Sequence, residues 1–177
     1  KGMESFDRGN HKKAIKHFNE AIKIDSDDSE SYMMRGYSES ELGNYQAAIT
    51  DYTKAIEINP NTYADYYYSR GLAKYRLSDK VGAIQDYNKA IKMKSDYEEA
   101  LYNRGQTKHE LGDLRGAIQD YSKVININNN VAKAYFNRGI AKYNLGDSNA
   151  ACMDWSKAGE LGLSIAYKRI RKYCNWN

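Results

Sequence analysis

The chain has 177 residues, of which 41% are hydrophobic and 28% are charged, with 13 Gly, one Pro and two Cys. This composition supports a folded core of domain size and excludes a collagen-like chain or a disulfide-dense scaffold, and the lack of any apolar run of about 18 residues excludes a membrane-spanning helix. The net charge of +4 comes from the C-terminal segment, because no acid follows Leu161 and four bases do: Lys168, Arg169, Arg171 and Lys172.

Three residue classes recur with one period along the chain. The glycines are separated by 34, 35, 34 and 34 residues, at Gly2, Gly36, Gly71, Gly105 and Gly139. The same spacing holds for Ala14, Ala48, Ala83, Ala117 and Ala151, and for the aromatic residues Phe18, Tyr52, Tyr87, Tyr121 and Trp155. Agreement of three series on one period indicates a repeat architecture, in which small residues let two helices approach closely and aromatic residues fill the space beside them.

In chain order, the pattern predicts a partial first repeat at 1–28, whose first helix is truncated to residues 1–7. Four complete repeats follow at 29–62, 64–97, 98–131 and 132–162. Each is expected to contain two helices, because small and apolar residues recur at spacings of three and four on both sides of a central turn. A last helix at 163–174, within the terminal segment 163–177, is expected to cap the array with one apolar face: Leu163, Ala166, Tyr167, Ile170 and Cys174.

The central turns carry helix-ending and helix-starting signals. Leu-Gly followed by Asn or Asp occurs at 42–44, 111–113 and 145–147. Gly ends one helix and the Asp or Asn caps the next. In the repeat at 64–97 the turn is Leu77, Ser78 and Asp79, which loses the Gly and keeps the cap.

One repeat carries a family pattern almost complete. The matching residues between 29 and 62 are Tyr32, Gly36, Gly43, Tyr45, Ala48, Tyr52, Ala55 and Pro60. They resemble the tetratricopeptide repeat, a helix-turn-helix unit of 34 residues, and the resemblance covers nearly the whole chain. It implies an all-α, right-handed α-solenoid with a C-terminal capping helix. Departures are modest: Pro60 has no counterpart elsewhere, Val124 replaces a late Ala, and one residue is inserted near Tyr63.

The resemblance also implies a function: a non-catalytic scaffold that binds a peptide or helix of a partner protein in a groove lined by the first helix of each repeat. Large apolar and aromatic side chains recur at the positions that face such a groove, and these residue types are enriched in binding hot spots. The predicted groove residues are Met33, Tyr37, Tyr68, Leu72, Tyr75, Tyr102, Gln106, His109, Phe136, Ile140 and Tyr143. The alternative is that these rings only pack on one another within the scaffold.

The residues favour three other functions less. Family members that hold the C-terminal carboxylates of chaperones use a clamp of Lys, Asn and Arg. Met3, Met34, Asp65 and Ser69 stand at its positions in the first register, so the clamp is absent there. Asn103, Asn137 and Lys133 match it partially further along, without the Arg that would bind a carboxylate with two hydrogen bonds. A structural scaffold that self-associates through its repeat ends is the main alternative. Nucleic-acid binding through the basic last helix is a weaker one, and its affinity would fall steeply with salt.

The sequence predicts no enzyme, cofactor or metal site. The histidines His11, His17 and His109 lack the spacing of a helical metal site, and no nucleophile motif or phosphate-binding glycine loop occurs.

Two further residue types recur with the repeat, an Arg just before each repeat Gly and an Asp just before each repeat aromatic residue. They predict ion pairs that connect helices: Arg35, Arg70, Arg104 and Arg138 with Asp51, Asp86, Asp120 and Asp154.

The two cysteines bear on the compartment. Cys152 stands where other repeats have Ile, so it is predicted to be a core residue, and Cys174 is expected to approach it because the last two helices should run antiparallel. Whether they pair is left open, since a disulfide would require export. The low Cys content predicts a cytoplasmic protein. Export is the alternative, because the chain begins at Lys1 and its native N-terminus is expected to lie upstream.

Overall fold

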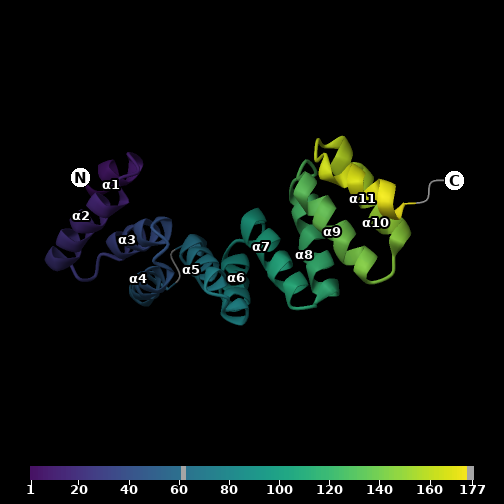
Figure 1. Ribbon diagram of the computed structural model, residues 1–177. Coiled ribbons are helices and arrows are strands. Elements are labelled where there is room, and N and C mark those ends of the chain that lie inside the picture. The colour runs from purple at the N-terminus through teal and green to yellow at the C-terminus, as the bar shows by residue number, and fades with distance from the viewer. Residues whose placement is uncertain (61–62, 175–177) are drawn as a thin grey trace. The chain divides into compact units, whose positions relative to one another are not determined.

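The computed structural model describes residues 1–60 and 63–174, and every regular element in this part of the chain is an α-helix (Figure 1). This confirms the predicted all-α class. The helices are α1 (Gly2–Asp7), α2 (His11–Ile24), α3 (Ser29–Glu41), α4 (Tyr45–Ile58), α5 (Ala64–Arg76), α6 (Lys80–Met93), α7 (Glu98–Glu110), α8 (Leu114–Ile127), α9 (Ala132–Asn144), α10 (Ser148–Glu160) and α11 (Ile165–Tyr173). We call α3, α5, α7 and α9 the first helices, and α4, α6, α8 and α10 the second helices.

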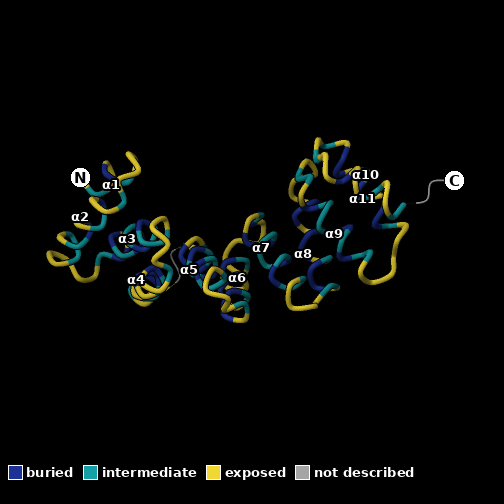
Figure 2. The backbone as a smooth tube through the Cα atoms, viewed as in Figure 1, coloured by how far each residue is buried: buried dark blue, intermediate teal, exposed yellow. Residues whose placement is uncertain are grey.

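The chain divides into two compact units. Unit 1 spans Lys1–Ser95 and unit 2 spans Asp96–Asn177. Within unit 1, α1 packs on α2, α3 on α4 and α5 on α6, and contacts of α2 with α3 and of α4 with α5 join these three pairs. Unit 2 repeats this arrangement with α7–α8 and α9–α10, joined by α8–α9, and adds α11 against α10. Figure 2 shows buried and exposed positions alternating along the helices, as expected when each helix buries one stripe against its neighbours.

The periodic glycines lie where two helices meet an aromatic ring. A Cβ atom added at Gly36 would lie 2.7 Å from the Tyr52 ring, and one added at Gly71 would lie 2.9 Å from the Tyr87 ring. Both rings are almost fully buried. The glycines therefore permit the close approach of first and second helices that the sequence predicted.

The turns within the pairs also follow the sequence. Gly43, Gly112 and Gly146 have φ values of 80°, 85° and 89°, in the left-handed region that favours glycine. Ser78 takes the same conformation with a φ of 65°, although it carries a side chain. Asp79 still caps α6, because its carboxylate accepts a hydrogen bond from the backbone N–H of Gly82 at 2.9 Å.

The predicted Arg–Asp pairs form in every complete repeat and connect each first helix to its second helix. Their Nη2–Oδ1 distances lie between 2.5 and 2.7 Å: Arg35–Asp51, Arg70–Asp86, Arg104–Asp120 and Arg138–Asp154. Each Arg also donates from Nε to the second carboxylate oxygen, which makes the pairs bidentate. Three of the arginines also donate to the preceding second helix, Arg35 to Asn19, Arg70 to Thr53 and Arg138 to Ser122.

A lysine one turn after the arginine was not anticipated as a third member of these pairs. Lys74, Lys108 and Lys142 each lie 2.8 Å from the carboxylate of their repeat. Glu39 occupies the corresponding position in α3. The Asp51 carboxylate is therefore paired with Arg35, and the other three are bridged by two cations each.

The last helix is shorter than predicted. The expected helix at 163–174 is α11 (Ile165–Tyr173), because Gly162 has a φ of 91° after α10 and Ser164 precedes the first helical residue. Leu163, Ala166 and Ile170 pack on the core around Trp155, as the capping prediction requires. Tyr167 remains 49% exposed, although its ring covers Gly159. Residues 175–177 of the predicted terminal segment lie outside the described residues.

Cys152 and Cys174 form a disulfide that fastens the end of α11 to α10. Their Cα atoms are 5.8 Å apart, and Cys152 is 6% exposed within the core of unit 2. The predicted core position of Cys152 is thus confirmed. The pairing that the sequence left open is settled by the antiparallel packing of α11 on α10.

Candidate functional site

The predicted groove residues all lie on first helices. In unit 1 they are on α3 and α5, and in unit 2 on α7 and α9. Met33 is buried at 3% exposure, and the other ten are intermediate in exposure. These side chains are therefore anchored in the scaffold with part of their surface accessible.

The rings of the groove residues rest on aromatic residues of the second helices. Tyr37 contacts Tyr52 with ring centroids 5.7 Å apart, and Tyr68 contacts Tyr87 at 6.0 Å. In unit 2, Tyr102 lies 5.7 Å from Tyr121, and Tyr143 lies 5.6 Å from Trp155. Each of these rings therefore packs within the scaffold on one side, as the alternative prediction states. Its intermediate exposure shows that another part of its surface remains accessible.

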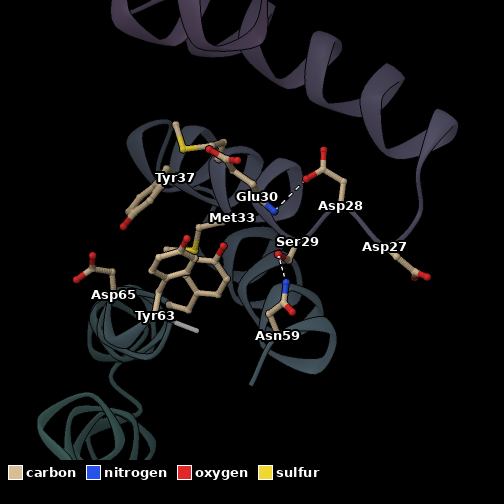
Figure 3. A pocket seen from close by; sticks show the side chains of 11 residues that line it. Asp27, Asp28, Ser29, Glu30, Met33, Tyr37, Asn59, Tyr63 and Asp65 are labelled. Atoms are coloured by element: carbon tan, nitrogen blue, oxygen red, sulfur yellow. Dashed lines mark hydrogen bonds between the residues drawn. The ribbon is translucent and has the colours of Figure 1, made fainter. Parts of the chain in front are cut away.

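Unit 1 has a pocket of about 570 Å³ between the starts of α3 and α5 (Figure 3). We call it the acidic pocket. Two predicted groove residues, Met33 and Tyr37, line it. The other lining residues were not predicted as site residues, and they are Asp27, Asp28, Ser29, Glu30, Met34, Asn59, Tyr63, Asp65 and Tyr66.

The start of α3 positions one wall of the acidic pocket. Asp28 caps the helix, since its Oδ1 accepts hydrogen bonds from the backbone N–H groups of Glu30 and Ser31 at 3.1 Å each. Ser29, the first residue of α3, accepts a hydrogen bond from Asn59 Nδ2 at 2.7 Å. Figure 3 shows both contacts. The cap and the Asn59 contact therefore fix the position of the first turn of α3, from which the Glu30 side chain extends.

Two tyrosine hydroxyls on the pocket wall are hydrogen-bonded to serines, Tyr37 to Ser69 and Tyr66 to Ser29. Ser69 Oγ donates to the Tyr37 hydroxyl at 3.0 Å, which links α5 to α3. Burial raises the pKa of Tyr37, and the negative charge of Asp65 raises it further. Burial likewise raises the pKa of Tyr66, with smaller contributions from Glu30 and Asp28. Both phenols therefore stay protonated at neutral pH.

Unit 2 has a smaller pocket of about 260 Å³ between α7 and α9. Three predicted groove residues line it, Gln106, His109 and Ile140, together with Glu110, Tyr121 and Asn137. Asn137 Nδ2 donates to the Tyr102 hydroxyl at 2.9 Å, which connects the two first helices. In unit 2 the pocket thus brings together predicted groove residues from successive repeats, whereas in unit 1 both predicted groove residues of the pocket lie on α3.

The groove prediction missed the acidic residues because they precede the positions that were assigned to the groove in each first helix. Asp27 and Asp28 belong to the loop between α2 and α3, and Tyr63 follows α4 and precedes α5. Two signals were available in the sequence. The inserted residue near Tyr63 marks a connection unlike the others, and an acidic residue stands six positions before three of the repeat glycines, at Glu30, Asp65 and Glu99. A groove prediction that included the first turn of each first helix and the loop before it would have identified the acidic residues.

The four bases of the last helix do not join either pocket's lining residues. Lys168, Arg171 and Lys172 are exposed, and Arg169 is intermediate. Arg169 and Lys172 both lie over the Tyr173 ring, at 5.6 and 5.1 Å from its centroid. Within the described residues, no group of three His, Cys, Asp or Glu side chains is placed to hold a metal ion. A search of those same residues finds no helix able to cross a membrane.

The fold and the paired first and second helices define a helical-repeat protein. Family models described as "TPR repeat" match residues 36–78, 82–112 and 105–146, and one described as "Tetratricopeptide repeat" matches residues 1–28. The chain belongs to the tetratricopeptide repeat family. Proteins of this family are typically non-catalytic scaffolds for protein interactions.

Solved structures with the same fold include MamA and YrrB. A crystal structure of MamA is 26% identical with a TM-score of 0.88, and the match covers 94% of this chain and 96% of that one. MamA from Desulfovibrio magneticus RS-1 is 20% identical with a TM-score of 0.86, covering 92% of each chain. YrrB, described as a TPR protein with an unusual peptide-binding site, is 19% identical with a TM-score of 0.84, covering 95% and 88%.

Proposed function

We propose that this protein is a non-catalytic adaptor that binds a peptide or helix of a partner protein along the face made by its first helices. The observation that carries the proposal is that predicted groove residues line a pocket in each unit: Met33 and Tyr37 in unit 1, and Gln106, His109 and Ile140 in unit 2. Aromatic side chains anchored on one side and accessible on the other suit such binding, because little conformational entropy remains to be lost. The peptide-binding description of YrrB agrees with this role.

The test is an affinity capture from a lysate of the source organism with the full chain as bait. The groove variant combines Tyr68→Ala, Tyr102→Ala and Phe136→Ala. We expect it to lose specific partners that the unmodified chain retains, as identified by mass spectrometry. Because these rings also contact second-helix residues, helicity and thermal unfolding of the variant must be measured alongside.

The chain offers a matched control on its second helices. Val81, Ile127 and Met153 are 62%, 43% and 68% exposed, and their replacement by Ala removes apolar surface of similar kind from α6, α8 and α10. Partners kept by this control and lost by the folded groove variant support the proposal. Recovery of the same proteins by both variants contradicts it. Recovery of further copies of this chain alone points to the self-associating scaffold, which a concentration-dependent mass would establish.

The disulfide bears on the compartment in which this adaptor works. The low Cys content predicted the cytoplasm, whereas a bond between Cys152 and Cys174 is typical of proteins in oxidising compartments. We therefore place the adaptor in an oxidising compartment as part of the proposal. Trapping of free thiols in intact cells, followed by mass analysis of the chain, tests this: alkylation of both cysteines contradicts it.

A further inference from the structure

The acidic pocket concentrates negative charge in a chain that is otherwise balanced. Outside the basic C-terminal segment the chain has 23 bases and 23 acids, yet the pocket is lined by four carboxylates: Asp27, Asp28, Glu30 and Asp65. None of the described lining residues is Lys, Arg or His. Charge complementarity therefore favours a cationic occupant.

The base of the pocket is apolar and aromatic. Met33 and Tyr66 are 3% and 6% exposed, and Tyr63 lies with its ring centroid 5.3 Å from that of Tyr66. Aliphatic stems of lysine and arginine pack on such surfaces while their charged ends stay near solvent, and the faces of tyrosine rings attract cations. The lining thus matches both parts of a long basic side chain.

The same residues are poorly arranged for a metal ion. Asp28 already accepts hydrogen bonds from two backbone N–H groups and from Ser31 Oγ, which satisfies the helix start. Asp65 lies on α5, and Glu30 lies on α3. In Figure 3 the labelled carboxylates lie apart from one another and do not converge on one point. Hard cations require several oxygen ligands at about 2.0–2.6 Å from one centre.

We propose that the acidic pocket recognises a lysine or arginine side chain of the partner polypeptide. Glu30 and Asp65 attract the charged end from two helices, and Met33, Tyr37 and Tyr66 receive the stem. The inference rests on the proposed function, because the basic side chain is taken to belong to the polypeptide that the first helices bind. The pocket's place on those helices supports this source.

The experiment is an NMR titration of the ¹⁵N-labelled full chain with blocked amino acids. The probes are Nα-acetyl-lysine methylamide and Nα-acetyl-arginine methylamide, each matched with an uncharged analogue, the Nε-acetylated lysine or the citrulline derivative. We expect saturable shifts confined to α3, α5 and the lining residues outside these helices, Asp27, Asp28, Asn59 and Tyr63, with Kd values on the order of 1 mM for the charged probes. The uncharged analogues should bind at least about tenfold more weakly.

Charge-removing variants connect the shifts to the pocket. Glu30→Gln and Asp65→Asn keep the shape of each side chain, and each should raise Kd by about three- to tenfold, with a larger effect for both together. Glu41→Gln is the matched control, because Glu41 is exposed at the opposite end of α3 and does not line the pocket. It should leave Kd unchanged.

Several outcomes overturn the inference. They are equal binding of charged and uncharged probes, shifts elsewhere in the chain, or insensitivity to Glu30→Gln and Asp65→Asn in variants whose spectra are otherwise native. Saturable shifts of the same residues by Ca²⁺ alone would assign the pocket to a metal. Loss of self-association in the two variants would assign it to the basic last helix of a second copy.

The two proposals fail separately. If the capture experiment finds a groove-dependent partner and the probes do not bind, the adaptor stands and the basic-side-chain inference is wrong. If the probes bind as expected and no polypeptide depends on the groove variant, the pocket binds cationic ligands and the adaptor proposal is wrong. That result also contradicts the polypeptide source proposed for the basic group.

Discussion

Breaking the disulfide should lower the stability of the chain by an amount that its loop length sets. Cys152 and Cys174 are separated by 22 residues. Closing a loop of this size lowers the conformational entropy of the unfolded state and thereby stabilises the folded state by about 3 kcal/mol. The α11 contacts of Leu163, Ala166 and Ile170 with the core remain without the bond. We therefore expect the helix to stay docked in the reduced protein, with a reduced free energy of unfolding.

The assay is urea unfolding with and without reductant, monitored through Trp155. Trp155 is fully buried beside Cys152, so its fluorescence reports on this core. The second tryptophan, Trp176, lies outside the described residues and is replaced through Trp176→Phe in every sample. Reduction should lower the extrapolated free energy of unfolding by about 3 kcal/mol, without loss of helicity in the absence of urea.

Cys174→Ser provides the control, because it removes the bond at the half-buried end and leaves the buried Cys152 in place. This variant should match the reduced protein and should not respond to reductant. Air-purified protein should also be lighter than its reduced form by two hydrogen atoms. The reasoning is refuted by two free thiols in the air-purified chain, or by a difference below about 1 kcal/mol between its oxidised and reduced forms.

Three further outcomes follow from local features. Tyr87→Phe should stabilise the chain or leave it unchanged, because the buried Tyr87 hydroxyl has no hydrogen-bond partner among the described residues. Tyr52→Phe should lower the free energy of unfolding by about 0.5–1.5 kcal/mol, because the Tyr52 hydroxyl is hydrogen-bonded to Ser40. Urea unfolding of both variants tests this pair of expectations, and equal losses of stability would contradict it. Ser78→Gly should stabilise by about 0.5–1 kcal/mol, because Ser78 holds a φ of 65°; an unchanged thermal midpoint would argue against strain there. Burial raises the pKa of Tyr52, Tyr87 and Tyr121 above the unfolded value of about 10, so their contribution to stability should be constant below that pH and fall as the pH rises above it. Circular dichroism across this pH range tests the direction of the change, and unfolding before pH 9 would contradict it.

The repeat made most of the fold predictable. Because Gly36 and its counterparts keep one spacing with the core aromatics, helix pairs, close contacts and Arg–Asp pairs could all be inferred from periodic positions. The Arg35–Asp51 pair and its three equivalents formed as predicted. The lysines bound to the same carboxylates were missed, since charged residues at a helical spacing of four are common on exposed faces.

The candidate site was only partly predictable. Periodicity identified Met33 and Tyr37, but the acidic pocket also needs Asp27, Glu30 and Asp65, which lie at or near helix starts and outside the positions predicted for the groove. Their proximity depends on how α5 packs beside α3. A sequence pattern records which face of one helix is apolar, and it does not record which loop residues meet across two helices.

What the sequence determined by itself is therefore the repeating unit: its two helices, its turns, its core residues and the family to which the chain belongs. These depend on contacts within a repeat or between adjacent repeats, which recur at fixed spacing. The tertiary structure alone decided that Cys152 bonds to Cys174 and that carboxylates from α3, α5 and the preceding loop share one pocket. The cysteine pair occurs once in the chain, and the pocket joins side chains from two helices and a loop, so only the packing of the helices in space brings these residues together.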